Sequence, residues 1–367
     1  MRQPICERSI RGRFLFTLAT TLLVMASFTA GGQGAVELPR LAAPVNTVVA
    51  TVPIFDGLLE GLAVSPDSKF VYVASYFSNS ISVIDAATNQ VGVTRLVAGN
   101  GPQQMAFSPI GTQLYIVNIV VDIFNGIFYP TGSGAGALSL ISGPPTCQGA
   151  FTKTIQGLGG YPTALAIAKD GKKIYVPDFE SGVVSVVKTS SNTVLPLQIQ
   201  AGRGPDAVAI TPDGTFLYIA NYYDNSVTVV ATVTQNVVGS PIKVGTNPEN
   251  IVITPDGKQA YVTNGDGTVS VIRTASNTVR ASISLGGQNN RQFGLQSAIT
   301  PDGKYLYAPC EDVYTVVVIS TQTNAVVGTP ISVGGVPTLV AIADNGKHAY
   351  VVNSFDNSVS VISITGG

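Results

Sequence analysis

Short stretches in which apolar and polar residues alternate run along the chain from residue 44 onward. Alternation with a period of two is the pattern of a β-strand that buries one face. One clear unit predicts four strands, at residues 205–211, 216–221, 226–230 and 237–244. Turns rich in polar residues and glycine separate these stretches, so the unit is predicted to be a four-stranded antiparallel sheet.

The same unit recurs along the chain, and its most regular feature is the turn between its first two strands. This turn reads Thr-Pro-Asp-Gly in three copies and related sequences in four more. Its third position falls at residues 67, 110, 170, 213, 256, 302 and 345, so the dominant spacing is 43 residues. Proline, aspartate and glycine each suit one position of a tight turn, and we interpret these aspartates as turn formers. Seven such units predict an all-β fold, a seven-bladed β-propeller with four-stranded antiparallel blades.

The last unit is incomplete, because it ends with its third strand at residues 359–364. Residues 44–53 resemble the fourth strands of other units. We therefore expect this N-terminal strand to complete the last blade and close the ring. Closure protects the sheet edge that would otherwise pair with another chain, so a monomer is expected. Residues 36–367 are predicted to form a single propeller domain.

Residues 1–35 have a different character from the repeats. Four arginines precede an apolar segment at residues 14–30, and small residues follow it. This order is typical of a cleaved signal peptide, and the alternative is an uncleaved anchor helix. The sequence thus predicts an exported protein, periplasmic, cell-surface or extracellular, with no membrane span after cleavage.

Composition narrows the classes of function. Hydrophobic residues make up 45% of the chain and charged residues 11%, which suits a large folded core. The formal net charge is −1, so no nucleic-acid partner is expected. The chain has one histidine, His348, and no cysteine pair with zinc-site spacing, so no cofactor or metal is expected. Cys147 and Cys310 are expected on opposite faces of different blades, too far apart for a disulfide.

The second strands carry a recurring tetrapeptide. It reads Tyr-Ile-Ala-Asn at residues 218–221 and Tyr-Val-Thr-Asn at residues 261–264. With the Pro-Asp-Gly turns and the Val-Ser-Val-Ile strands, the chain resembles the YVTN family of β-propeller repeat proteins over residues 44–367. The resemblance implies the fold and says little about function, since that family includes surface-layer and cell-surface proteins. Related propellers include lactonases and periplasmic redox proteins, but the shared motif is structural and assigns no catalytic residue.

The units differ most at the residue after the proline that leads into each first strand. These positions are Glu60, Gln103, Thr163, Asp206, Glu249, Leu295 and Thr338. By repeat register they surround the mouth of the central channel, and a concave mouth with polar and aromatic walls is a common form of binding site. Loops on the same face add two arginines and two tyrosines. The predicted ligand-binding residues are Glu60, Gln103, Arg203, Asp206, Tyr222, Tyr223, Glu249 and Arg291, with no catalytic or metal-binding residue assigned.

Alternatives remain open for several of these residues. Asp206 and Glu249 belong to adjacent blades and could share a cation or a proton, although we expect solvated channel carboxylates. Tyr222 and Tyr223 either line the site or cover the edge of a blade. The second unit also carries an insertion at residues 119–135, on the same rim, which is either a recognition loop or lid or a tolerated surface insertion.

The preferred interpretation is a binding or surface scaffold module that acts through this rim. Its partner would be a small polar molecule, a glycan or a protein. The alternative is a propeller enzyme of lactonase or lyase type, with carboxylates and arginine at the channel mouth as acid, base and anion-stabilising groups.

Overall fold

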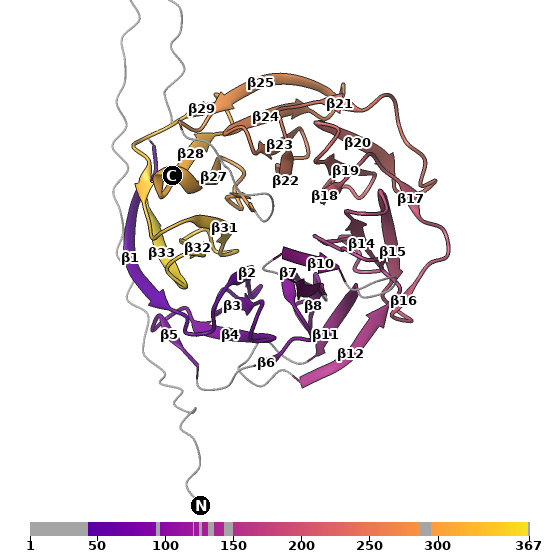
Figure 1. Cartoon of the computed structure of the whole chain (residues 1–367). Coiled ribbons are helices and arrows are strands. Elements are labelled where there is room, and N and C mark those ends of the chain that lie inside the picture. The colour runs from indigo at the N-terminus through magenta and orange to yellow at the C-terminus, as the bar shows by residue number, and fades with distance from the viewer. Residues whose placement is uncertain are drawn as a thin grey trace, which may run out of the picture. The chain divides into compact units, whose positions relative to one another are not determined.

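The computed structural model describes residues 43–92, 96–119, 121–124, 127–130, 136–142, 150–286 and 295–365. Residues 42–367 form one compact unit. Its strands assemble into seven antiparallel sheets around a central opening (Figure 1). The seven-bladed propeller predicted from the repeats is therefore confirmed. The predicted signal peptide (residues 1–35), Cys147 and Arg291 lie outside the described residues.

The first three blades follow the chain order from the innermost strand outward. Blade one contains β2 (Leu59–Val64), β3 (Phe70–Ser75), β4 (Ser80–Asp85), β5 (Gln90–Val91) and β6 (Leu96–Val97). Blade two contains β7 (Pro102–Phe107), β8 (Gln113–Asn118), β11 (Ala137–Ser142) and β12 (Ala150–Gln156). Blade three contains β13 (Ala166–Ile167), β14 (Lys173–Asp178), β15 (Val183–Lys188), β16 (Thr193–Val194) and β17 (Ile199–Gln200).

The next three blades repeat this order. Blade four contains β18 (Pro205–Ile210), β19 (Phe216–Asn221), β20 (Ser226–Ala231) and β21 (Ile242–Lys243). Blade five contains β22 (Pro248–Ile253), β23 (Gln259–Asn264), β24 (Thr268–Arg273) and β25 (Thr278–Ser284). Blade six contains β26 (Ala298–Ile299), β27 (Tyr305–Cys310), the 3₁₀ helix η1 (Glu311–Val313), β28 (Thr315–Ser320), β29 (Ala325–Val326) and β30 (Ile331–Ser332).

Blade seven is built from both ends of the propeller, as predicted. It contains β31 (Pro337–Ile342), β32 (His348–Asn353), β33 (Ser358–Thr365) and the N-terminal β1 (Val45–Pro53). The register runs antiparallel from Val45 opposite Thr365 to Pro53 opposite Ser358. The closing strand thus pairs along its length with β33 and covers an edge that would otherwise be free.

The outermost strands are shorter than the sequence pattern predicts. In blade four the expected strand at residues 237–244 is reduced to β21 and an isolated bridge between Val230 and Val237. Gly239 and Pro241 interrupt the segment between them. Glycine weakens a strand and proline cannot donate to the ladder, which explains the break.

The core of the molecule lies between neighbouring blades. Among the described residues, seven clusters of buried apolar side chains each join two blades that are adjacent in the ring. The tyrosine of the repeated tetrapeptide adds a polar tie between blades. The Tyr218 hydroxyl donates to Asn277 Oδ1 at 2.6 Å, and the Tyr261 hydroxyl donates to Asn324 Oδ1 at 2.6 Å. The hydroxyl of Tyr307 reaches Asn46 of the closing strand at 2.7 Å.

The asparagine that ends the tetrapeptide ties the second strand to the third. The Asn264 side-chain amide donates to the hydroxyls of Thr268 and Ser270, both at 3.0 Å. Asn221 and Asn353 make the equivalent bonds in blades four and seven. The repeated tetrapeptide therefore makes contacts between strands and between blades, as expected of a structural motif.

The insertion of blade two lies between β8 and β11, where the repeat spacing places it. It contains a two-stranded hairpin of β9 (Val121–Phe124) and β10 (Ile127–Pro130), which projects onto the inner part of blade two in the view of Figure 1. Cys310, in β27, is buried. Within the described ranges, no helix is long and apolar enough to cross a bilayer.

Candidate functional site

In five blades the innermost strand carries a β-bulge at the end that faces the channel mouth; these strands are β2, β7, β18, β22 and β31. In β18 the pairing register shifts between Pro205 and Ala207, which leaves Asp206 as the extra residue. The same register shift leaves Glu60 as the extra residue in β2 and Glu249 as the extra residue in β22. A bulge bends the strand and redirects the side chain of the extra residue. The residue after the leading proline therefore leaves the alternation of its strand.

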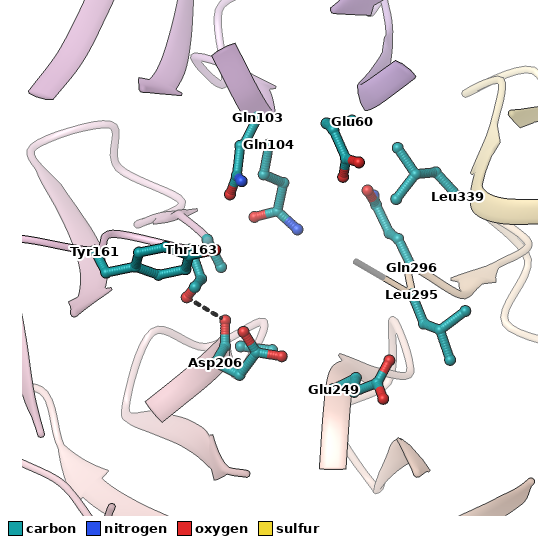
Figure 2. A pocket seen from close by; sticks show the side chains of 12 residues that line it. Glu60, Gln103, Gln104, Tyr161, Thr163, Asp206, Glu249, Leu295, Gln296 and Leu339 are labelled. Atoms are coloured by element: carbon teal, nitrogen blue, oxygen red, sulfur yellow. Dashed lines mark hydrogen bonds between the residues drawn. The ribbon is translucent and has the colours of Figure 1, made fainter. Parts of the chain in front are cut away.

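The redirected side chains meet at one cavity, which Figure 2 shows in close view. Its lining is Glu60, Gln103, Gln104, Tyr161, Thr163, Ala164, Asp206, Ala207, Glu249, Leu295, Gln296 and Leu339. Six of the seven ring positions predicted from repeat register belong to this lining; at the seventh, Thr338, the next residue lines the cavity instead. The cavity measures about 40 Å³. At ~10–15 Å³ for each water, it has room for roughly three water molecules.

The two carboxylates of blades four and five are buried. Asp206 is 5% exposed and Glu249 is 3% exposed. The expectation that they are solvated channel carboxylates is therefore wrong. The bulges explain the difference, because they turn both side chains from the strand surface into the crowded inner edge of the ring.

Burial changes the protonation of both acids. Desolvation raises the pKa of Asp206 to about 8. Desolvation also raises the pKa of Glu249 to about 9, with further contributions from the charges of Asp206 and Glu311, while the backbone amide of Leu295 opposes the shift. Both groups are thus predominantly protonated at neutral pH in the free protein. Shifted pairs of this kind in a concavity are typical of functional sites.

The hydrogen bonding around these acids is incomplete. Within the described part of the chain, neither carboxylate oxygen of Glu249 has a hydrogen-bond partner of normal geometry, and the same holds for Oε1 of Gln296. By contrast, Gln104 Oε1 accepts from the Leu165 amide at 2.8 Å. The Thr163 hydroxyl donates to the backbone carbonyl of Asp206 at 2.7 Å, which links blades three and four. The open hydrogen-bonding capacity is therefore concentrated on Glu249 and Gln296.

The structure brings together only part of the predicted ligand-binding set. Glu60, Gln103, Asp206 and Glu249 share the cavity. Arg203 does not: its Nε lies 2.7 Å from Asp224 Oδ1, and its side chain is 77% exposed. Arg203 thus belongs to an ion pair within the outer loops of blade four, although it lies on the predicted face.

Tyr222 and Tyr223 form part of an aromatic cluster beside the cavity. Tyr222 is buried and Tyr223 is 54% exposed. Phe179 stacks against both, with ring centroids 5.7 Å from Tyr222 and 5.1 Å from Tyr223. It also contacts Tyr161 of the cavity lining at 6.0 Å. The cluster therefore joins the cavity wall to the exposed rim.

Sequence reasoning missed Gln104, Tyr161 and Gln296 as lining residues. Gln104 follows the ring position Gln103, and the bulge of β7 contains both residues. Gln296 follows the ring position Leu295, precedes β26 and forms an isolated bridge with Leu339 of blade seven. Tyr161 directly precedes a leading proline. Glu311, which begins η1 and is 4% exposed, contributes charge near Glu249. The sequence shows that these positions are polar, but it does not show the irregular strand geometry that directs their side chains toward the cavity.

Among the described residues, no group of three or more histidine, cysteine, aspartate or glutamate side chains is arranged to hold a metal ion. The described part of the lining carries Glu60, Asp206 and Glu249 but no lysine, arginine or histidine. The site is thus an acidic, largely protonated cavity with tyrosine, threonine and glutamine side chains around it.

Comparisons with known proteins agree with the fold. The sequence profile of the family described as "Lactonase, 7-bladed beta-propeller" matches residues 145–249. No curated protein matches the chain. Among solved structures, hydrazine synthase of Kuenenia stuttgartiensis is similar, with a TM-score of 0.71, 23% sequence identity and coverage of 85% of this chain and 97% of that chain. At this identity the likeness shows a shared propeller fold.

Proposed function

We propose that this chain is an exported β-propeller that binds a small polar molecule at the mouth of its central channel. The observation that carries the proposal is the carboxyl group of Glu249, which is buried at the cavity without a hydrogen-bond partner of normal geometry among the described residues. An unsatisfied buried polar group costs about 1–3 kcal/mol, and a ligand that supplies the partner recovers that cost. Export rests on the signal-peptide pattern of residues 1–35.

A small molecule fits these features better than a glycan chain or a protein partner. Macromolecular recognition needs a broad contact surface, whereas the open hydrogen-bonding groups lie inside a cavity of about 40 Å³. The resemblance to surface proteins of the YVTN family concerns the repeats, which the structure uses for contacts between blades. The mouth is where the blades differ, so ligand binding is assigned there.

A thermal-shift screen tests this proposal. The compounds are divalent cations, sugars, lactones and small amines, applied to the wild type and to Glu249→Gln and Asp206→Asn. At least one class should raise the melting temperature of the wild type and raise that of the two variants less. The matched control is Glu180→Gln, which removes an exposed carboxylate outside the cavity lining. A screen in which no compound shifts the wild type would overturn the proposal.

Lactone hydrolysis is a second candidate function, and one observation favours it. The lactonase profile covers residues 145–249, which include both Asp206 and Glu249. Acids with pKa values of about 8 and 9 suit general acid–base catalysis near neutral pH. A lactone ring exceeds the cavity and would have to sit above it. A pH-stat assay with a δ-lactone would show acid release that depends on Glu249; equal rates in the wild type and Glu249→Gln would exclude this role.

A lyase that uses arginine beside the carboxylates has less support. Such a mechanism needs a cation close to the reacting carboxylate or enolate. Arg203 is engaged with Asp224 away from the cavity. Arg291, the other predicted arginine, lies outside the described residues.

A further inference from the structure

The cavity wall offers hydrogen-bonding oxygens and carboxyl groups that can become charged. Neither oxygen of Glu249 nor Oε1 of Gln296 has a hydrogen-bond partner of normal geometry in the described part of the molecule. Asp206 is buried in the adjacent blade, and no described basic side chain belongs to the lining. A ligand that satisfies this wall must supply N–H or O–H donors. A positively charged ligand also stabilises the ionised form of the carboxyl groups, because its charge offsets the cost of burying a carboxylate.

A cluster of packed aromatic rings joins this wall to the rim; Phe179 and Tyr222 are buried within it, and Tyr223 is exposed. Tyr161 lines the cavity and contacts Phe179, which in turn contacts Tyr222 and the half-exposed Tyr223. Tyr222 and Tyr223 are themselves packed edge to face, with centroids 5.2 Å apart. Aromatic faces attract cations and also bury hydrocarbon. The site therefore combines a small acidic end with an apolar wall that opens to the rim.

We propose that the mouth binds an organic amine, with its protonated amino group between Asp206, Glu249 and Gln296 and its carbon body on the aromatic cluster. This proposal rests on the proposed function and names the ligand class of that site. A cavity of about 40 Å³ accepts an ammonium head of about the size of a water molecule, and the larger body remains outside it. The N–H donors of a primary ammonium group can satisfy the two oxygens of Glu249, which have no hydrogen-bond partner of normal geometry among the described residues, while Oε1 of Gln296 lies on the other side of the cavity, beside Glu60 (Figure 2).

A metal ion fits this wall less well. Calcium takes six to eight oxygen ligands, and magnesium needs close octahedral geometry. The acids of the lining come from different blades, and no metal-holding group of three occurs among the described side chains. An anionic ligand is disfavoured because the wall holds carboxyl groups and, among the residues that the structure describes, no cation.

Binding of an amine should release protons. Among the described residues, the titratable groups of the lining are all acidic: Glu60, Tyr161, Asp206 and Glu249. Glu311 and Tyr222 are close enough to act on Glu249 or to be acted on by it. Burial keeps Asp206 and Glu249 protonated in the free protein at neutral pH. An arriving cation favours their charged forms, so a carboxyl proton leaves to solvent as the ammonium enters.

The test is calorimetric titration of the full protein at pH 7 with benzylammonium chloride. Benzyl alcohol and benzoate at equal ionic strength are the neutral and anionic comparisons, and a pH indicator in weakly buffered solution follows proton release. Benzylammonium should bind at least tenfold more tightly than either comparison and release protons. Glu249→Gln and Asp206→Asn, checked for folding by circular dichroism, should each weaken it at least tenfold, while Glu180→Gln should leave the affinity unchanged.

Several results would overturn this inference. Equal binding of benzyl alcohol or benzoate would do so, as would binding without proton release or stabilisation by calcium in place of the amine. Arg291→Gln should bind benzylammonium as the wild type does. If only that variant bound benzylammonium, the wild-type chain would itself supply a cation to the carboxyl groups, through Arg291, and the inference would be wrong. If sugars or lactones bind and amines do not, the ligand class is wrong while the proposed binding site stands. If no compound binds, both proposals fail.

Discussion

In blade four, an aspartate stands at each end of the innermost strand, and the two aspartates serve different purposes. At the turn end, Asp213 accepts hydrogen bonds from the Thr211 hydroxyl at 2.5 Å and the Thr215 amide at 3.0 Å, which lower its pKa. At the mouth end, seven residues earlier, Asp206 is buried and its pKa is raised to about 8. Hydrogen bonds favour the charged form of one aspartate, and desolvation favours the neutral form of the other.

The turn end recurs and the mouth end does not. Thr254 with Asp256 and Thr300 with Asp302 reproduce the geometry of blade four, each with a threonine hydroxyl 2.6 Å from the aspartate. At the mouth, the equivalent position changes from glutamate to glutamine, threonine, aspartate and leucine around the ring. We interpret the recurring turn residues as required by the fold of the blades. We interpret the varying mouth residues as a binding site, and the experiments below test this distinction between structural and binding residues.

The largest effect is expected from removal of the closing strand. Deletion of residues 44–53 leaves the outer edge of β33 unpaired, although β32 still pairs with its inner edge, and exposes Val359 and Val361, which are buried in the core between blades seven and one. We expect loss of the folded monomer, seen as oligomers in size-exclusion chromatography with light scattering and as loss of a cooperative thermal transition.

A chain that begins at residue 43 is the control for this deletion and should melt cooperatively as a monomer. If the shorter chain, without residues 44–53, is also monomeric and melts within a few degrees of the control, ring closure by β1 is not needed for folding.

The next largest effect is expected in the pH dependence of stability, because the carboxyl groups at the mouth end and at the turn end of the innermost strands have pKa values shifted in opposite directions. The pKa of Glu249 is raised from its ordinary 4.5 to about 9 in the folded protein, so between these values the native state holds a proton that the unfolded chain has lost. Stability from this group is therefore full below pH 4.5 and falls as pH rises, by at most about 1.4 kcal/mol per pH unit. Glu249→Gln lacks this titration, so its melting temperature should fall less than that of the wild type between pH 5 and 8.

Melting curves at each pH unit, with Glu180→Gln as the control, measure this difference. The control should follow the wild type. Parallel curves for the wild type and Glu249→Gln would show that Glu249 is charged in the folded protein, and the contrast with the turn aspartates would not hold.

The fold could be predicted from the sequence because its determinants are local and repeated. The Pro-Asp-Gly turn and the alternation of the strands each mark a blade, and the incomplete last unit marks the closing strand. The main error in the fold was the length of the outer strand of blade four. Its apolar and polar residues alternate as in a strand, but Gly239 and Pro241 interrupt the strand. The low strand propensity of these two residues therefore mattered more than the alternation.

The site could be predicted only in part. Repeat register identified Asp206 and Glu249 as mouth residues because register depends on counting along the chain. Their burial was not predicted, because a β-bulge changes which way one side chain points without changing the residues around it. The pairing of Arg203 with Asp224 was missed for another reason, since it depends on two loops 21 residues apart. Contacts between loops leave no period in the sequence.

A smaller effect is expected at the turn end. Asp256→Ala removes the acceptor for the Thr254 hydroxyl and for the Lys258 amide. A hydrogen bond of this kind contributes about 1 kcal/mol, so chemical denaturation should show a loss of about that size, without change in ligand affinity. The same substitution at Asp213 should have a similar effect, because the geometry is the same. A change in ligand affinity in either variant would show that residues at the turn end also affect binding, which would contradict the distinction between structural and binding residues.

The smallest effect is expected from Arg203→Ala, which tests where the site ends. Arg203 and Asp224 form an exposed ion pair, and such pairs contribute about 0–1 kcal/mol. The backbone amide of residue 203 also donates to Asp224 at 2.8 Å, and alanine keeps that bond. The melting temperature should therefore change little, and the affinity for benzylammonium should match that of the wild type in the same titration. A loss as large as that of Glu249→Gln would extend the site from the inner strands to the outer loops of blade four, because a residue outside the cavity would then control what the cavity binds.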